Sequence, residues 1–366
     1  MRVLIDTTFA LRGPSGTGVY LERLIGALRA LGVDVVEAAD PSRRALTPGR
    51  GRVLDLAADA RWTQVDLPRL ASLAEADLIH HPQPARAGRG APAQVVTVHD
   101  LAPERVPECF DAGRRRFNHV AHRAAARRAE VVIAVSQTTA TDVMARWGVP
   151  AGRIVVARHG PGQEPAPGSL ERRPPRHLLY VGDDEPRKNL GLLLAAHGRY
   201  RAAVRGALPL VLAGGARRRA EGVEVVERPG AERLAELYAG AAALVHPSRY
   251  EGFGLTALEA MSAGVPVVAA RSPGLVEVCG DAAMLFDVSS ADDLASAMAE
   301  VAGSAPLRRD LAERGRRRAA EFSWARSARA HIGAYERAAT ARPRVLPPRR
   351  RPRPDATRRQ GEQPPS

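Results

Sequence analysis

Short apolar runs alternate with amphipathic stretches along this chain, and the alternation restarts after a break rich in proline and glycine at residues 161–176. Before the break, the predicted strands are 2–6, 33–37, 77–80, 94–98, 131–135 and 153–157, separated by helical stretches such as Val19–Leu31 and Asp111–Ala129. Strands that alternate with helices predict a parallel sheet covered on both faces.

The second half repeats this pattern. The predicted strands are 177–182, 208–213, 223–226, 242–246 and 265–269, and the predicted helices are 189–203, 231–239, 254–263, 291–302 and 306–321. A chain of 366 residues suits two domains of ordinary size. We therefore expect the following units: a first domain at 1–165, a linker at 166–176, a second domain at 177–322, a helix at 323–340 that crosses back to the first domain, and a disordered tail rich in proline and arginine at 341–366.

The composition, 45% hydrophobic and 26% charged residues, is that of a soluble globular protein. We expect no signal peptide and no membrane span. Cys109 and Cys279 are distant from each other and form no metal-ligand pattern, which favours the cytoplasm. The net charge is +14, of which residues 342–366 contribute +6, and the remainder suits anionic small molecules or an anionic membrane surface. We find no nucleic-acid recognition motif, so no nucleic-acid partner is expected.

Lys188 is the only lysine, because the other basic residues of the chain are arginines. It lies in the segment Tyr180–Asn189, which has the pattern of a strand, a turn at Gly182 and a helix start. Arg187 and Lys188 at this strand edge can neutralise a diphosphate. The competing interpretations are an exposed basic helix start, which the helix dipole disfavours, and a metal site at the acids 183–185, which the adjacent cations disfavour.

The segment 246–268 carries the sharpest pattern. A buried strand ends at His246, a turn with glycines follows, a helix begins near Gly254, and Gly264 ends that helix. Backbone N–H groups of Phe253, Gly254 and Leu255 would point toward the carboxyl edge of a parallel sheet, where open α/β folds bind ligands. A helix start of this kind favours an anion, and its glycines let a phosphate approach.

Two glutamates flank this helix start. Glu259 lies about one turn into the helix and can accept hydrogen bonds from a ribose diol, while Glu251 precedes the helix at the other end of the ligand. For isolated glutamates, a surface turn and a solvated helix position are the ordinary interpretations. The surrounding turn, glycines and helix ends favour a ligand site.

Four further segments are candidates for the N-terminal side of a cleft. Gly16, Gly18 and Tyr20 belong to a glycine-containing first turn that is not a dinucleotide fingerprint. His99 and Asp100 end a strand. Ser136 follows another strand and is equally explained as a helix N-cap, and His159 stands in a further loop before the break.

The stretch from Glu251 to Pro266 resembles the retaining nucleotide-sugar glycosyltransferases of family 4, whose signature is a Glu-x7-Glu pair with Phe-Gly after the first Glu. The resemblance extends over nearly the whole chain except the tail. It implies an α/β fold of GT-B architecture, in which two Rossmann-like doubly wound domains face a central cleft. The family needs neither a metal nor another cofactor. Its first Glu contacts hydroxyls of the donor sugar, and its second Glu holds the nucleotide ribose.

The resemblance also implies a role for each candidate. Lys188 matches the lysine of the family loop, whereas Asp183 replaces the usual arginine after the glycine, so Arg187 is taken as the second cation. The Glu-Pro-Arg-Lys-Asn loop resembles mannosyltransferase-like members and favours GDP-mannose. The implied catalytic residues are Lys188, Arg187, Glu251 and His99; the donor-binding residues are Gly16, Gly18, Gly182, Phe253, Gly254, Leu255 and Glu259; and the acceptor-side residues are Tyr20, Asp100 and Ser136.

Several alternatives stay open from the sequence. The acceptor is a glycan, a lipid-linked glycan or a small molecule. Six arginines between Arg114 and Arg128 form either a solvated face or a contact with anionic lipid at the inner face of the membrane. A glycoside hydrolase using Glu251 and Glu259, a nicotinamide oxidoreductase and a basic nucleic-acid-binding protein are the rival functions.

Overall fold

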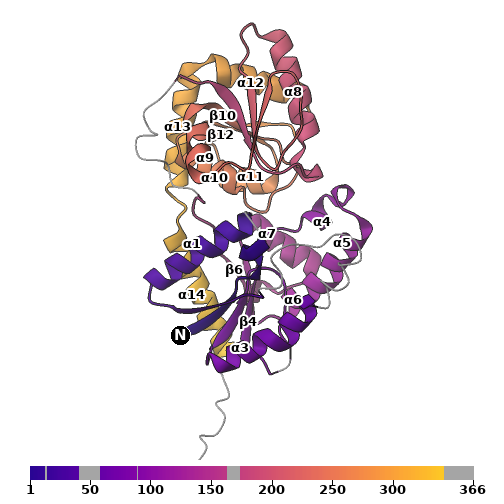
Figure 1. Ribbon diagram of the computed structural model, residues 1–366, viewed down its shortest axis with the longest axis vertical. Helices are drawn as coiled ribbons and strands as arrows, with labels where there is room; N and C mark the ends of the chain where they lie inside the picture. The colour runs from indigo at the N-terminus through magenta and orange to yellow at the C-terminus, as the bar shows by residue number, and fades with distance from the viewer. Residues whose placement is uncertain (13–14, 41–57, 89, 163–173, 342–366) are drawn as a thin grey trace, which may run out of the picture.

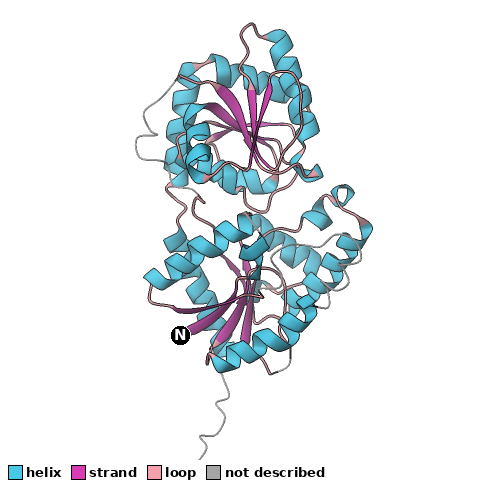
Figure 2. Ribbon diagram, viewed as in Figure 1, coloured by secondary structure: helices cyan, strands magenta, loops and turns pink. Residues whose placement is uncertain are grey.

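Each half of the chain builds its own six-stranded parallel sheet, and the two halves are stacked along the long axis of the molecule (Figure 1). The computed structural model describes all residues except 13–14, 41–57, 89, 163–173 and 342–366. Most of the predicted linker and the predicted tail from 342 onward lie outside the described residues. Helices surround both sheets, as Figure 2 shows.

The N-terminal sheet has the order β2-β1-β3-β4-β5-β6, with every neighbouring pair parallel. Its strands are β1 (Arg2–Asp6), β2 (Asp34–Ala38), β3 (Leu78–His81), β4 (Ala93–Val98), β5 (Val131–Ala134) and β6 (Ile154–Val156). Its helices are α1 (Gly16–Ala30), α3 (Leu67–Leu73), α4 (Ala102–Arg105), α5 (Ala112–Phe117), α6 (Arg123–Arg128) and α7 (Gln137–Asp142). β3, β4 and β5 are buried along their whole length, which is why β5 is a continuous apolar run and the polar residues of β3 and β4 are themselves buried.

The C-terminal sheet has the order β12-β11-β10-β7-β8-β9, again wholly parallel. Its strands are β7 (His177–Val181), β8 (Leu210–Gly214), β9 (Val223–Glu227), β10 (Ala241–His246), β11 (Val267–Ala270) and β12 (Ala283–Phe286). Its helices are α8 (Leu190–Ala203), α9 (Ala231–Gly240), α10 (Leu255–Ser262), α11 (Pro273–Cys279), α12 (Ala291–Gly303) and α13 (Ala305–Ala319). Both domains are doubly wound, as the sequence predicts.

Four of these elements correspond to no strand or helix named in the sequence analysis: α3, α4, α11 and β12. The start of α11 is instructive, because Pro273 and Gly274 have the composition of a turn. Proline is well tolerated at the first position of a helix, where its missing N–H has no partner to lose. The short helix α11 therefore begins at two residues whose composition is typical of a turn.

The last helix, α14 (Trp324–Ala341), packs along the N-terminal sheet although it follows the C-terminal domain in the sequence (Figure 1). A chain of hydrogen bonds joins it to that sheet. His331 Nδ1 lies 2.7 Å from the carbonyl oxygen of Ser327, so this nitrogen must carry the proton. In the neutral ring Nε2 then accepts, and the hydroxyl of Tyr20, 2.9 Å away, donates to it.

The same logic fixes the remaining links. Thr97 donates to the oxygen of Tyr20 at 2.9 Å, and Nε2 of His80 donates to Thr97 at 2.8 Å. Nδ1 of His80 therefore accepts from the hydroxyl of Tyr335 at 2.8 Å. Every donor and acceptor is matched only while both histidines are neutral. Burial lowers the pKa of His331 to about 4 and lowers that of His80 well below its usual value, which agrees with this arrangement.

Candidate active site

The candidate site lies where the strand order of the C-terminal sheet reverses. β7 and β10 are neighbours, but the chain continues from them toward opposite edges of the sheet. Ligands of open α/β sheets bind at such a switch point, outside the carboxyl ends of the strands. The turn after β7 carries Arg187 and Lys188, and the turn after β10 carries Glu251. A backbone hydrogen bond of 2.9 Å from Arg249 N to Arg187 O joins the two turns.

The charged side chains of these turns form one cluster. The ammonium of Lys188 donates to Oε1 of Glu251 at 2.7 Å, and Nη1 of Arg187 donates to Oε2 at 3.2 Å. The side chain of Lys188 is only 16% exposed, that of Arg187 15% and that of Glu251 11%. Two cations therefore share one carboxylate in a partly dehydrated position, and a second acid, Glu185, pairs with Arg187 from a more exposed position.

The cluster keeps Glu251 ionised. Burial alone would raise its pKa, but the nearby Lys188 and Arg187 outweigh that effect and hold the pKa of Glu251 below its usual range. Burial would likewise lower the pKa of Arg187, whereas Glu251 and Asp100 raise it above its usual value. His246 stands behind the cluster, with Nε2 4.0 Å from Oε1 of Glu251, and burial lowers its pKa to about 4.

The acids of the first turn do not converge. Asp184 pairs with Arg218 at 2.8 Å, Glu185 pairs with Arg187 at 2.7 Å, and Asp183 lies against Gly215. Within the described ranges, no group of three His, Cys, Asp or Glu side chains is placed to hold a metal ion. The alternative of a metal site at residues 183–185 therefore has no support in the arrangement of these side chains.

The start of α10 has the expected form. Gly254 caps the helix with φ +108°, a conformation that favours glycine, and Gly264 follows the helix with φ +69°. Among the described residues, no protein acceptor pairs with the backbone N–H groups of Phe253, Gly254 or Leu255. Three donors at a helix N-terminus thus lie on the turn that carries Glu251.

Glu259 lies one turn further along α10 and is buried. The hydroxyl of Tyr238 donates to its Oε2 at 3.1 Å. Gly162 covers its other oxygen, since a Cβ added to Gly162 would lie 2.3 Å from Oε1, 2.9 Å from Val19 and 3.3 Å from Leu255. The first turn of α1 therefore approaches the start of α10 through Gly162. Gly16 and Gly18 lie in the first turn of α1, and the N–H of Gly18 donates to the side chain of Ser15.

On the N-terminal side, His99 and Asp100 reach the same turn. A Cβ on Gly252 would lie only 1.8 Å from the carbonyl oxygen of His99 and 2.9 Å from Cβ of Asp100. Nε2 of His99 donates to the carbonyl oxygen of Pro82 at 2.9 Å, so its Nδ1 is the accepting nitrogen of the neutral ring. Gly182, unlike Gly252, packs within its own domain, against the ring of Tyr180 and against Gly214.

Two acceptor-side assignments change. Tyr20 has no exposed surface and its hydroxyl belongs to the hydrogen-bond chain beneath α14, so it is a packing residue rather than an acceptor contact in this structure. Ser136 is also fully buried. It is the N-cap of α7, accepting from Thr139 N at 2.9 Å, and it donates to the carbonyl oxygen of Gly252. The N-cap interpretation of Ser136 is confirmed.

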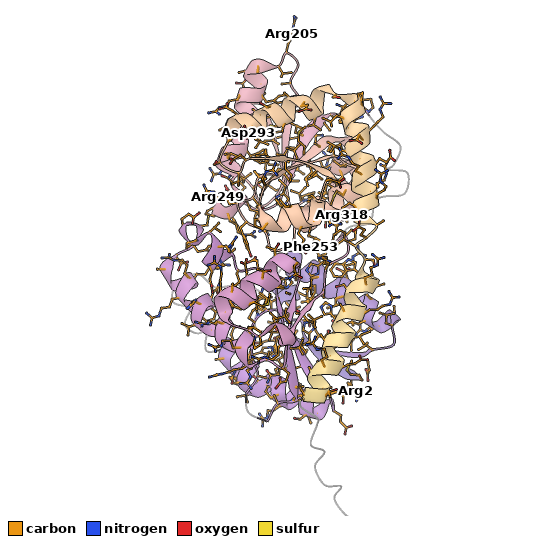
Figure 3. All side chains as sticks on the ribbon, turned by 180° about the vertical axis from the view of Figure 1, so that it is seen from behind. Arg2, Arg205, Arg249, Phe253, Asp293 and Arg318 are labelled. Atoms are coloured by element: carbon orange, nitrogen blue, oxygen red, sulfur yellow. The ribbon has the colours of Figure 1, made fainter. Side chains whose placement is uncertain are left out.

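Several further residues complete the site, and of these the sequence analysis named only His159 as a candidate. Tyr250 and Asp142 join the two domains, and Tyr238 holds Glu259. Trp324 donates from Nε1 to the carbonyl oxygen of Pro161 at 2.7 Å. The ring of His159 stacks on Trp324 and meets the edge of Phe253. Figure 3 shows Phe253 at the level where the domains meet. Apart from His159, only Tyr250, directly before Glu251, stands next to a motif that the sequence analysis used.

Comparison with known proteins agrees with this geometry. The model of family 4 glycosyltransferases matches residues 14–160, and that of group 1 glycosyl transferases matches residues 166–318. The O-antigen chain mannosyltransferase B of Escherichia coli is 31% identical over 266 residues, which cover 66% of this chain and 70% of the relative. The chain belongs to the group 1, family 4 glycosyltransferases.

Solved structures show the same architecture. The sucrose-phosphate synthase of Thermosynechococcus elongatus superposes with a TM-score of 0.75 at 19% identity, covering 93% of this chain and all of the other. The Anabaena protein HepE, solved in complex with UDP and glucose, gives a TM-score of 0.69 at 18% identity, covering 92% of this glycosyltransferase and 99% of HepE. The protein thus has the GT-B fold with two Rossmann-like domains.

None of the helices in the described part of this glycosyltransferase is both long enough and apolar enough to cross a membrane.

Proposed function

We propose that this glycosyltransferase moves a hexose from a nucleotide-diphosphate sugar to an acceptor in the cleft, with retention of the anomeric configuration and without a metal ion. The observation that carries the proposal is the cluster of Lys188 and Arg187 on Glu251, beside the N-terminus of α10. These groups supply the positive potential that a bound metal supplies to other diphosphate leaving groups.

The proposed reaction is an attack from the front face of the donor sugar. The acceptor oxygen bonds to the anomeric carbon, and the bond from that carbon to the phosphate oxygen breaks with its electron pair going to the phosphate. The acceptor proton passes to the departing diphosphate. Negative charge grows on the diphosphate in the transition state, where Lys188, Arg187 and the amides of Phe253–Leu255 stabilise it.

Position supports the proposed donor-binding roles. Glu251, beside Lys188, is the proposed acceptor of hydrogen bonds from donor-sugar hydroxyls, and Glu259, held by Tyr238, is the proposed acceptor from the ribose. GDP-mannose is the proposed donor, since the loop Glu185–Asn189 is mannosyltransferase-like and the Escherichia coli relative is a mannosyltransferase. The acceptor is a glycan, a lipid-linked glycan or a small molecule, on the side of His99 and Asp100.

Thermal unfolding in the presence of candidate donors tests the proposal first. A donor that binds only the folded state at 100 times its Kd stabilises the protein by about 2.7 kcal/mol, so GDP-mannose should raise the Tm more than UDP-glucose, NADH or a DNA duplex. Equal responses to all four would remove the donor assignment. A response to NADH alone would favour the oxidoreductase.

Product analysis tests the mechanism. With the donor found in this way, the anomeric proton of the first-formed product should show the configuration of the donor, and turnover should persist after dialysis against EDTA. An inverted product contradicts the retaining mechanism, and loss of turnover restored by Mg²⁺ or Mn²⁺ contradicts metal independence. Cleavage of aryl glycosides without a nucleotide would favour the glycoside hydrolase.

Contact with an anionic membrane is a further part of the proposal. The helix α5 is exposed along its whole length. Phe117 at its end is 49% exposed, and Val120 in the following turn, Asn118–His122, is 60% exposed, both close in the sequence to Arg114–Arg116. Apolar side chains beside arginines suit the interface of an anionic bilayer. Flotation with vesicles containing phosphatidylglycerol should carry the protein at low salt, whereas phosphatidylcholine vesicles should not. The double variant Phe117→Ser, Val120→Ser should weaken flotation. Unchanged flotation would exclude this surface as the membrane contact.

A further inference from the structure

The turn that carries Glu251 is held from the other domain. This turn belongs to the C-terminal domain, yet the carbonyl oxygen of Gly252 accepts hydrogen bonds from Ser136 Oγ at 2.5 Å and from Thr139 Oγ1 at 3.2 Å. Both donors stand at the start of α7 in the N-terminal domain. The peptide immediately after Glu251 is therefore fixed by side chains that do not belong to the sheet on which Glu251 is built.

The residue before Glu251 is held in the same way. The hydroxyl of Tyr250 donates to Oδ2 of Asp142 at 2.9 Å and accepts from the N–H of Leu101 at 3.4 Å. Tyr250 is 1% and Asp142 6% exposed. Asp142 also faces Arg105 at 3.7 Å, so its charge is compensated inside the N-terminal domain. A phenol of one domain thus occupies a polar pocket of the other.

Steric contacts leave the turn little freedom between these two anchors. Gly252 lies directly against the backbone of His99, and Gly274 at the start of α11 lies against the carbonyl oxygen of Glu251, 2.1 Å from where its Cβ would stand. The backbone of Glu251 is therefore enclosed by α11 on one side and by the end of β4 on the other. A shift of the N-terminal domain must displace this backbone.

We propose that Tyr250 and Asp142 are positioning residues, through which docking of the N-terminal domain sets Glu251 on Lys188 and Arg187. The catalytic consequence of this positioning rests on the proposed function. The charged cluster of the donor domain reaches its working geometry only when the acceptor domain is docked. Donor cleavage is thereby coupled to the presence of the domain that holds the acceptor, which restricts hydrolysis of the donor by water.

Lys188 offers a probe that needs neither donor nor activity. It is the only lysine of the chain, so amine labelling at this site is resolved from the N-terminal amine by peptide mass spectrometry. Its nitrogen is engaged by Glu251 and largely shielded. Release of Glu251 from this ion pair should free the ammonium and raise the labelling rate by an N-hydroxysuccinimide ester. Glu251→Gln, which removes the carboxylate charge, sets the upper limit of the increase.

The test compares Tyr250→Phe and Asp142→Asn with the parent protein. Each variant should raise the labelling rate of Lys188 by about three- to tenfold, toward that of Glu251→Gln, and the double variant should exceed neither single one, because the two residues act as one unit. In turnover, each should lower kcat by about 10- to 100-fold while the Kd for GDP changes less than threefold. If the two residues served folding alone, the variants would have a lower Tm, but kcat would not fall while the Kd for GDP stayed nearly constant.

Arg158→Ala is the matched control. Arg158 also joins the domains, through Glu277 at 3.0 Å, but contacts no part of the turn at 250–252. It should leave the labelling rate and kcat within about twofold of the parent. Parent-like labelling in Tyr250→Phe and Asp142→Asn, or equal increases in Arg158→Ala, overturns the proposal. If labelling responds as expected but the parent transfers no sugar from any donor, the positioning stands and the proposed function fails.

Discussion

Lys188 on the turn after β7 donates a 2.7 Å hydrogen bond to Glu251 on the turn after β10. The two residues come from adjacent strands at the switch point of the C-terminal sheet, and Arg187 binds the second oxygen of the same carboxylate. Without Glu251, the two cations would repel each other in a poorly hydrated position. The carboxylate therefore stabilises the two cations next to each other, on the side of the sheet where the proposed diphosphate binds.

Lys188→Met should lower kcat by about 100- to 1,000-fold, since removal of one preorganised donor to developing negative charge costs about 3–4 kcal/mol in the transition state. The folded state retains Arg187 as a partner for Glu251, so the free energy of unfolding should fall by only about 1–3 kcal/mol. Steady-state kinetics and urea unfolding measure the two effects. Arg218→Met, which removes an exposed cation paired with Asp184 nearby, should stay within twofold of the parent. An unchanged kcat in Lys188→Met would defeat the assignment of Lys188.

The sequence was sufficient to predict this part of the site because its signals are local. A buried strand followed by a glycine or proline turn and a helix start places the turn at the carboxyl edge of the sheet. Two such segments, ending near Lys188 and Glu251, share one edge wherever their strands are neighbours. The order β10-β7 makes them neighbours, although no local pattern dictates that order.

The contacts between domains were not predictable in this way. Whether Tyr20 faces the cleft or the core depends on the rotation of α1 about its axis, and the helix α14 that covers Tyr20 comes from the other end of the chain. Asp142 is likewise an ordinary helix residue in the sequence, and only the docked position of Tyr250 gives it a partner. Local patterns specify each domain better than the surface between the domains.

Gly252→Ala should separate the two domains at the site. Its Cβ would lie 1.8 Å from the carbonyl oxygen of His99; the backbone fixes the positions of both atoms, so no side-chain rotation relieves the clash. We expect kcat to fall more than 100-fold, and small-angle scattering should show a larger radius of gyration, while each domain remains folded. Gly198→Ala is the control, because Gly198 in α8 has no atom within 4 Å of the added Cβ and alanine favours a helix by about 0.5–1 kcal/mol. A Gly252→Ala protein with the kcat and dimensions of the parent would contradict this packing argument.

Tyr238→Phe should weaken donor binding without changing the chemical step. The hydroxyl of Tyr238 holds Oε2 of Glu259, the carboxylate proposed to accept from the ribose, and this interaction is the same in the ground state and the transition state. We expect the KM of the donor to rise about fivefold to 20-fold with kcat within threefold of the parent. Tyr200→Phe removes a hydroxyl that binds Leu208 N elsewhere in the same domain and should leave both constants unchanged. A fall in kcat at constant KM in Tyr238→Phe would instead place Glu259 in the chemical step.

The hydrogen-bond chain beneath α14 predicts how stability depends on pH. His331 has its pKa lowered from 6.5 to about 4 by burial, so between these values the unfolded chain binds a proton that the folded protein does not. The stabilisation by neutral His331 is fully present above pH 6.5 and is lost as the pH falls toward 4, with a slope of up to about 1.4 kcal/mol per pH unit. His80 adds a contribution of the same sign, because its pKa is lowered as well.

His331→Gln removes this titration and should flatten the pH dependence of the unfolding free energy between pH 6.5 and 4, whatever its effect at neutral pH. Urea unfolding at half-unit steps of pH measures the slope in His331→Gln and in the parent protein. Equal slopes in His331→Gln and the parent would mean that the imidazole of His331 is protonated in the folded protein. The chain of hydrogen bonds from Ser327 to Tyr335 would then need a different arrangement of protons, since an imidazolium ion at His331 could not accept from Tyr20.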